Sequence, residues 1–165
     1  MTQKLIFIGG EAWTGKSTCA ERLYKCLNNS VWLDGDDVWR INPWSLEDSR
    51  LRTSDINVAF VLQTYLESDF EYVILTSIVV SVPEIAKRIL GLIKAQEYEF
   101  ISITLMCDEN TLRERAIERD NNQSPTFVVL EQTKQIENTI RIDTANRKPE
   151  EVVDDLYKVI YESKE

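Results

Sequence analysis

Short apolar runs alternate along the chain with longer stretches in which apolar side chains recur every three or four residues. A short apolar run is typical of a buried strand, and a three-to-four spacing is typical of one face of an amphipathic helix. The runs predict strands at residues 5–8, 31–33, 72–75, 100–106 and 139–142. The spaced patterns predict helices at residues 20–27, 58–66, 85–93, 108–120 and 152–160.

Residues that favour helix ends lie beside several of these patterns. The Thr-Ser-Asp run at 53–55 supplies N-cap candidates for the second helix. Pro83 and Pro149 suit the first turn of a helix, where the missing N–H has no intrahelical partner. Ser124-Pro125 follows a polar break after the charged helix and predicts the cap of another helix.

The order of these elements indicates the fold class. A strand followed by a helix, repeated, predicts right-handed crossovers and an α/β fold with helices on both faces of a mostly parallel sheet. The 165 residues contain no repeat and no linker, so we expect a single domain over 1–165. Ligands of such sheets bind beyond the carboxyl ends of the strands, which directs attention to the loops after the first three strands.

The loop after the first strand carries the most specific motif in the sequence. Residues 10–17 read G-E-A-W-T-G-K-S and match the phosphate-binding pattern G-x4-G-K-[ST]. Gly10 and Gly15 permit a turn whose amides form an anion nest, and the following helix adds the positive end of its dipole. We expect Lys16 to contact the β- and γ-phosphates of ATP and Ser17 to contact Mg²⁺. The nest is predicted to include the remaining residues of this segment: Ala12, Trp13, Thr14 and Thr18. The alternative is a glycine-rich turn with a solvated lysine.

Two carboxylates follow the second strand. Asp34 and Asp36 are two residues apart, so in extended chain they face the same way, toward the γ-phosphate in such a fold. One could accept the proton of an acceptor hydroxyl, and the other could hold Mg²⁺ with Ser17. Asp36 is a candidate for both duties, and which carboxylate has which stays open. The alternative is that these acids cap the following turn, where we expect Asp37 to be only an N-cap.

At these residues the chain resembles the small P-loop kinases that phosphorylate small-molecule hydroxyls, among them shikimate kinase, gluconate kinase, adenylylsulfate kinase and chloramphenicol phosphotransferase. Residues 33–40, L-D-G-D-D-V-W-R, are similar to the adenylylsulfate kinase stretch L-D-G-D-N-V-R. The resemblance implies a P-loop NTPase fold, a five-stranded parallel sheet in the order 2-3-1-4-5, and a short lid. It also implies that Asp34 and Asp36 bind the acceptor hydroxyl. Trp39 and Arg40 would lie on the acceptor side, although Trp39 displaces Arg40 from the family's arginine position.

The charged helix resembles the element L-x2-R-x3-R that leads into the lid of these kinases, here Leu112, Arg115 and Arg119. The resemblance implies that Arg115 lies over the adenine, that Arg119 reaches the phosphates, and that the lid covers about 119–127. A guanidinium at the γ-phosphate would neutralise charge in the transition state. The alternative is a solvated helix of Glu/Arg pairs.

The turn at 142–152 resembles the one that edges the adenine base in these kinases. It implies that Asn146 and Arg147 contact the base. The alternative is a solvated turn between a strand and a helix, which is equally compatible with the sequence. On the acceptor side, Trp39 and Trp44 with Arg50 and Arg52 would suit a planar or anionic acceptor, or would simply be core aromatics and surface arginines.

Composition narrows the chemistry further. Lysine plus arginine is 19 and aspartate plus glutamate is 28, so the net charge is −9, which argues against nucleic acid or an anionic membrane as partner. The chain has no histidine, which excludes Ser-His-Asp chemistry and zinc binding through imidazole. Cys19, Cys26 and Cys107 form no disulfide framework, and no apolar run reaches the length of a membrane span, so we expect a cytoplasmic protein.

The sequence therefore predicts an ATP- and Mg²⁺-dependent kinase acting on a small-molecule hydroxyl, as a monomer or a homodimer. One alternative is a nucleoside or nucleotide kinase, which is weakened because the third strand ends in Thr76-Ser77 without the aspartate common in nucleotide monophosphate kinases. A second is a nucleotide-binding switch without acceptor turnover, which is weakened by the lack of a D-x-x-G or N-K-x-D motif. A third is a non-catalytic relative.

Overall fold

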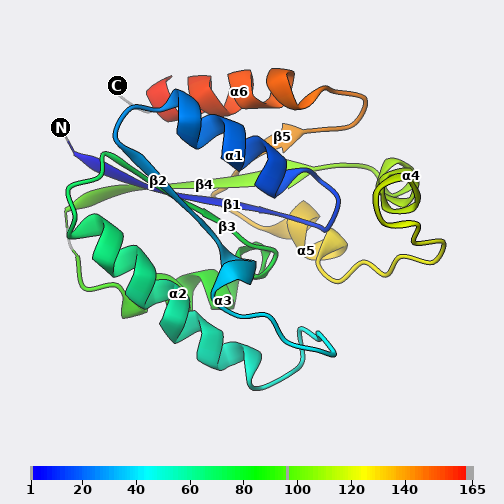
Figure 1. Ribbon diagram of the computed structural model, residues 1–165, viewed down its shortest axis with the longest axis horizontal. Helices are drawn as coiled ribbons and strands as arrows, with labels where there is room; N and C mark the ends of the chain where they lie inside the picture. The colour runs from blue at the N-terminus through cyan, green and yellow to red at the C-terminus, as the bar shows by residue number, and fades with distance from the viewer. Residues whose placement is uncertain (1, 96, 163–165) are drawn as a thin grey trace.

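A five-stranded sheet runs through the middle of the molecule (Figure 1). The computed structural model describes residues 2–95 and 97–162, so the outermost residues of the predicted domain, 1 and 163–165, lie outside it. All strand pairs are parallel and the order is β2-β3-β1-β4-β5, as the resemblance implied. The strands are β1 (Gln3–Gly10), β2 (Ser30–Asp34), β3 (Tyr72–Thr76), β4 (Tyr98–Met106) and β5 (Ile140–Asp143).

Helices cover both faces of this sheet (Figure 1). On one face lie α1 (Lys16–Cys26) and α6 (Pro149–Glu162), and on the other lie α2 (Leu51–Leu66) and α3 (Pro83–Leu92). Near the carboxyl end of the sheet are α4 (Glu109–Asp120), α5 (Leu130–Gln135) and the short 3-10 helices η1 (Gly35–Asp37) and η2 (Val79–Ser81). Within residues 2–95 and 97–162, no helix combines the length and apolarity needed to cross a bilayer.

The central strand β1 shows why the apolar runs in the sequence have no alternating polar positions. Leu5 and Phe7 of β1 pack with the α2 and α3 side chains, while Ile6 and Ile8 pack with those of α1 and α6. Side chains alternate along a strand, and a strand with helices on both faces buries every one of them. These four side chains are at most 1% exposed. The edge strand β5 is exposed at three of its four positions, which accounts for its weak pattern.

Helix ends agree with the sequence in part. Pro83 and Pro149 open α3 and α6 as predicted. The N-cap prediction for 53–55 is wrong, because α2 already begins at Leu51 after a turn in which the Asp48 carboxylate accepts the Arg50 N–H.

The predicted helix cap at Ser124-Pro125 is also wrong. The next helix, α5, begins only at Leu130. The residues between are held by tertiary contacts instead: the Phe127 ring packs edge-on against Trp13, and the Val129 N–H donates to a glutamate of the first loop. These distant partners replace a local cap.

The carboxyl ends of three strands meet at one edge of the sheet. Both Ile8 of β1 and Asp34 of β2 lie in register with Thr76 of β3. The loop after β1 therefore starts two residues beyond the level of Asp34, on the neighbouring side of β3. This register brings the predicted phosphate loop and the predicted carboxylates to the same place.

Candidate active site

The loop between β1 and α1 has the backbone that its glycines predict. Gly10 and Gly15 have φ angles of +139° and +93°, and a Cβ at Gly10 would lie 2.7 Å from the Leu105 carbonyl oxygen. No other residue fits so close to that strand. Helix α1 starts at Lys16 without a side-chain cap, so the amides of its first turn are available to a ligand. Such an N-terminus favours an anion.

Glu11, the first residue of this loop, is a site residue that the sequence did not reveal. Its side chain is buried, and its carboxylate accepts the N–H of Ala12 at 2.8 Å and that of Val129 at 2.7 Å. The loop is thereby fastened to the chain that precedes α5. A glutamate in a variable position of the motif gives no local signal of burial, because its second partner lies 118 residues further along the chain.

Lys16 lies against the loop from which it projects. Its Nζ donates to the Glu11 carbonyl oxygen at 2.8 Å. Burial lowers the Lys16 pKa to about 8, against the opposing pull of the negative charges of Glu11, Asp36 and Asp34. A bound anion would stabilise the ammonium form and raise this pKa again.

Asp34 and Asp36 occupy the adjacent wall, as predicted. The Ser17 hydroxyl donates to the Asp34 carboxylate at 2.5 Å, and the other Asp34 oxygen accepts the Asp36 N–H at 3.1 Å. Asp34, not Asp37, is therefore the N-cap of η1. Asp36 keeps contact with solvent, yet its partial withdrawal from water and then the charge of Asp34 raise its pKa.

Ser17 and Asp34 are also a suitable pair for a magnesium ion. Mg²⁺ usually takes one or two protein oxygens and completes its shell with phosphates and water. The Ser17 hydroxyl and the Asp34 carboxylate supply two oxygens in contact with each other. Elsewhere in the described chain, no cluster of three or more acidic or cysteine side chains could hold a metal by itself.

These residues line one cavity of about 430 Å³. The phosphate loop forms one wall, the ends of β2 and β3 form another, and the segment after α4 closes the third side. The lining residues are Glu11, Ala12, Trp13, Gly15, Lys16, Ser17, Thr18, Asp34, Asp36, Trp44, Thr76, Ser77, Ile78, Arg119, Thr126 and Val128. Thr126 belongs to the predicted lid, and Val128 follows it directly.

A second cavity of about 400 Å³ lies on the other side of the phosphate loop. Helix α4 and the turn between β5 and α6 border it, with Arg115, Glu118, Arg147 and Val152 among its walls. Trp13, Gly15, Thr18 and Arg119 line both cavities, so the two cavities adjoin at the phosphate loop and at the end of α4.

The two arginines of the second cavity also fasten the fold. Arg115 donates to the carbonyl oxygens of Trp13 and Thr144, and Arg147 donates to the Asp143 carbonyl oxygen and pairs with Asp155. Both guanidinium groups are therefore fixed as walls. Asn146, predicted beside them, is exposed and does not line the cavity, because it takes the left-handed conformation of a turn with a φ of +53°.

Arg119 reaches both cavities from the last turn of α4. Its guanidinium pairs with Asp120, which raises the Arg119 pKa and lowers that of Asp120 to about 2. Asp120 also accepts the Trp13 indole N–H at 2.7 Å. The end of α4 and the phosphate loop are thus joined through one carboxylate.

Solved structures share this fold over nearly their whole length. The tunicamycin resistance protein of Deinococcus radiodurans superposes with a TM-score of 0.72 at 18% identity, over 96% of this chain and 95% of that one. A gluconokinase from Sinorhizobium meliloti gives 0.66 at 13% identity, over 99% of both chains. The APS kinase of Mycobacterium tuberculosis, in complex with AMPPNP and APS, gives 0.66 at 13% identity, over 97% of this chain and 98% of that one.

The chain has the fold of the small-molecule P-loop kinases. No protein-family model matches the sequence, and no curated protein sequence matches it. At identities this low the likeness establishes the fold, and the arrangement of the site rests on this chain's own geometry.

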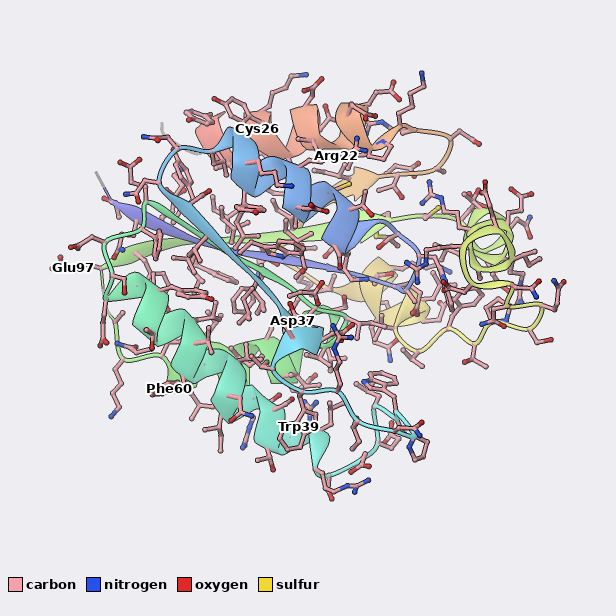
Figure 2. The ribbon with its side chains drawn as sticks, viewed as in Figure 1. Arg22, Cys26, Asp37, Trp39, Phe60 and Glu97 are labelled. Atoms are coloured by element: carbon pink, nitrogen blue, oxygen red, sulfur yellow. The ribbon has the colours of Figure 1, made fainter. Side chains whose placement is uncertain are left out.

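Two residues predicted for the acceptor side of this kinase fold do not line the cavity. Trp39 packs on the apolar cluster between the sheet and α2, and Figure 2 shows it beside the first turn of that helix, away from Asp37. Arg40 is exposed and pairs with Asp37 at 2.7 Å. Trp44 and Ser77 line the cavity instead. Trp39 and Trp44 were both predicted on the acceptor side from the sequence. Only the path of the folded chain shows that Trp44 lines the cavity and Trp39 does not.

Proposed function

We propose that this protein is an ATP- and Mg²⁺-dependent phosphotransferase that moves the γ-phosphoryl group to a hydroxyl of a small molecule. The observation that carries the proposal is the 2.5 Å contact between Ser17 of the phosphate loop and Asp34 of β2, with Asp36 on the same cavity wall. A phosphate loop and two carboxylates within one cavity provide the parts that phosphoryl transfer requires.

The triphosphate would lie along the phosphate loop. The free amides at the start of α1 and the Lys16 ammonium would hold the β- and γ-phosphates, and Arg119 would neutralise charge on the transferring group. The second cavity would take the adenosine, with Arg115 and Arg147 as its walls. Arg119 lines both cavities, so its position suits a triphosphate that passes from one to the other.

Ser17 and Asp34 would hold the magnesium ion. When bound there, the ion neutralises charge on the β- and γ-phosphates. Sequence features alone leave this duty between Asp34 and Asp36; the contact with the Ser17 hydroxyl favours Asp34.

Asp36 would act on the acceptor. Its carboxylate would accept the proton of the acceptor hydroxyl as that oxygen bonds to the γ-phosphorus. The bond between the γ-phosphorus and the bridging oxygen breaks, and ADP leaves. A raised pKa suits a general base, because a stronger base takes the proton more readily.

Known structures support this proposal without deciding the acceptor. Two of the similar structures are kinases by name, and one of these was solved with AMPPNP and APS. Strand β3 ends at Thr76 and is followed by Ser77, with no carboxylate at either position, which supports a small-molecule acceptor over a nucleoside monophosphate.

The test is transfer of labelled phosphate. The protein, Mg²⁺ and γ-labelled ATP are incubated with separate pools of uncharged, cationic and anionic hydroxyl compounds. We expect labelled product from at least one pool, and a loss of about 10²–10⁴-fold in the Asp36→Asn variant. Binding of ATP without transfer to any pool would contradict the proposal and favour a nucleotide-binding switch.

A further inference from the structure

Among the described residues that line the first cavity, the acceptor end has acidic, neutral polar and apolar side chains but no cation of its own. Lys16 and Arg119 are the two cationic side chains among the lining residues of this cavity, and the proposed function assigns both to phosphates. Asp34 and Asp36 face the space beyond them, and the rest of that wall includes Trp44 and Ile78.

The arginines of the segment between β2 and α2 are already paired with carboxylates. Arg40 pairs with Asp37 at 2.7 Å. Arg50 contacts both oxygens of Asp48, the shorter distance being 2.7 Å. Neither arginine lines the cavity. The sequence-based suggestion that arginines here would serve an anionic acceptor therefore finds no free guanidinium in this segment.

A third carboxylate holds two more arginines. The Asp55 side chain is fully buried in α2 and lies 3.4 Å from an Arg52 nitrogen and 3.2 Å from an Arg88 nitrogen. Its oxygens have no hydrogen-bond partner among the described residues, so these two ion pairs are what offsets its burial. Moving either arginine toward a ligand would leave a buried charge less compensated, which is costly.

We propose that the acceptor is a hydroxyl compound that carries no anionic group and that places an apolar portion against Trp44 and Ile78. This inference rests on the proposed function and names the substrate class for its acceptor site. Asp36 would face a phosphate, sulfate or carboxylate on the acceptor, while Lys16, Arg119 and the magnesium ion on Asp34 would already be balanced by the triphosphate. Like charges placed together disfavour a wrong partner strongly, so Asp36 selects against anions.

The test compares matched acceptors that differ in one anionic group. The pairs are methyl shikimate with shikimate and gluconamide with gluconate. Transfer of the labelled γ-phosphoryl group is measured for each at saturating ATP and Mg²⁺. We expect every productive pair to favour its uncharged member by at least about tenfold in kcat/KM.

A charge-adding variant sharpens this comparison. Trp44→Arg places a guanidinium on the acceptor wall, and Trp44→Gln is the matched control of similar polarity without charge. We expect Trp44→Arg, but not Trp44→Gln, to move the preference within a pair toward the anionic member by about tenfold. Each variant is compared with the wild-type protein at equal ATP saturation, so that an effect on the nucleotide is separated from an effect on the acceptor.

Two results would overturn the inference, and they differ in what they say of the proposed function. Preference of the wild-type protein for the anionic members would reject the substrate class while supporting the kinase. Absence of transfer to every member, with ATP bound, would reject the kinase and the substrate class together.

Discussion

Lys16 and Asp36 are each shifted toward their neutral forms, although they lie in one cavity with opposite charges. Burial lowers the Lys16 pKa to about 8, and partial desolvation with the charge of Asp34 raises the Asp36 pKa. With a pKa of about 8, the lysine is still mostly charged at neutral pH. The raised pKa makes the Asp36 carboxylate a stronger base than an ordinary aspartate.

From the lowered pKa of Lys16 we predict that ATP binding is accompanied by proton uptake at alkaline pH. Below pH 8 the free lysine is already charged, whereas above pH 8 it is mostly neutral and the bound triphosphate restores its proton. Affinity should therefore weaken as the pH rises above about 8, by up to about tenfold per unit. Calorimetry at pH 9 in buffers of different ionisation enthalpy measures the uptake.

Lys16→Arg is the control for this prediction, because a guanidinium stays charged throughout this range. Its residual ATP binding should show no proton uptake at pH 9. An unchanged uptake in Lys16→Arg, or none in the wild-type protein, would assign the titration to another group.

From the role proposed for Asp36 we predict that the rate falls at low pH. The carboxylate must be ionised to accept the hydroxyl proton, so kcat should fall as the pH drops through its raised pKa, above the range of an ordinary aspartate. Asp34→Asn removes the neighbouring negative charge, so the limit for its residual activity should move to lower pH. The measurement is a pH–rate profile at saturating Mg²⁺. Asp48→Asn, remote from the cavity, should leave the limit in place; an equal shift in both variants would contradict the coupling.

Individual site residues were predictable where the signal is local. Lys16, Ser17 and Asp34 follow from a motif and from spacing along one strand. The sequence did not mark Glu11 as buried, because its partner Val129 is far along the chain. It also did not separate Trp44 from Trp39, because the position of Trp44 depends on the path of an irregular segment. Such residues are decided by tertiary contacts, which no short stretch of sequence contains.

At the scale of elements, the phosphate loop depends on β4 as well as on its own glycines. A Cβ at Gly10 would meet the Leu105 carbonyl oxygen at 2.7 Å, whereas at Gly15 it would meet only Cys19 Sγ at 3.9 Å. Gly15→Ala should therefore cost only the left-handed backbone strain, about 1–2 kcal/mol, and Gly10→Ala should cost more. Urea unfolding measures both, and an equal or smaller loss in Gly10→Ala would contradict the predicted contact.

The link between the phosphate loop and the chain before α5 makes another prediction. In Glu11→Gln one carboxylate oxygen becomes an amide donor, which cannot accept from Ala12 or Val129. One buried N–H then loses its partner, and the free energy of unfolding should fall by about 1–3 kcal/mol. Glu114→Gln, exposed on α4, is the matched control and should change little. Equal stability of the two variants in urea would show that the link is unimportant.

Elements themselves were predicted well because each depends on a repeated local pattern. The helix and strand predictions match α1 to α4, α6 and β1 to β5, with boundaries a few residues apart. The failures are at caps: 53–55 lies inside α2, and Ser124-Pro125 precedes an extended segment. Where a helix begins depends on which side chains bind the backbone N–H groups before it. Here the Asp48 carboxylate accepts the Arg50 N–H before α2, and the Glu11 carboxylate accepts the Val129 N–H before α5.

At the scale of the whole molecule, the alternation of strands and helices is enough to specify a covered parallel sheet, and similar structures keep it at 13–18% identity. Layer packing needs only apolar side chains in the right order, so many sequences satisfy it. The acceptor wall is different, because its charge depends on which arginine meets which carboxylate. Arg52 reaches Asp55 within α2, whereas Arg88 reaches it from α3, a meeting that only the assembled fold creates.

The most direct test of the account is a crystal structure of the protein with Mg²⁺ and a non-hydrolysable ATP analogue. We predict phosphates against the amides of residues 12–18 and the Lys16 ammonium, with the metal bound by Ser17 and Asp34 oxygens. The γ-phosphate should point toward Asp36, leaving room for a hydroxyl between them. Density for the analogue outside this loop, or a γ-phosphate directed away from Asp34 and Asp36, would contradict the account.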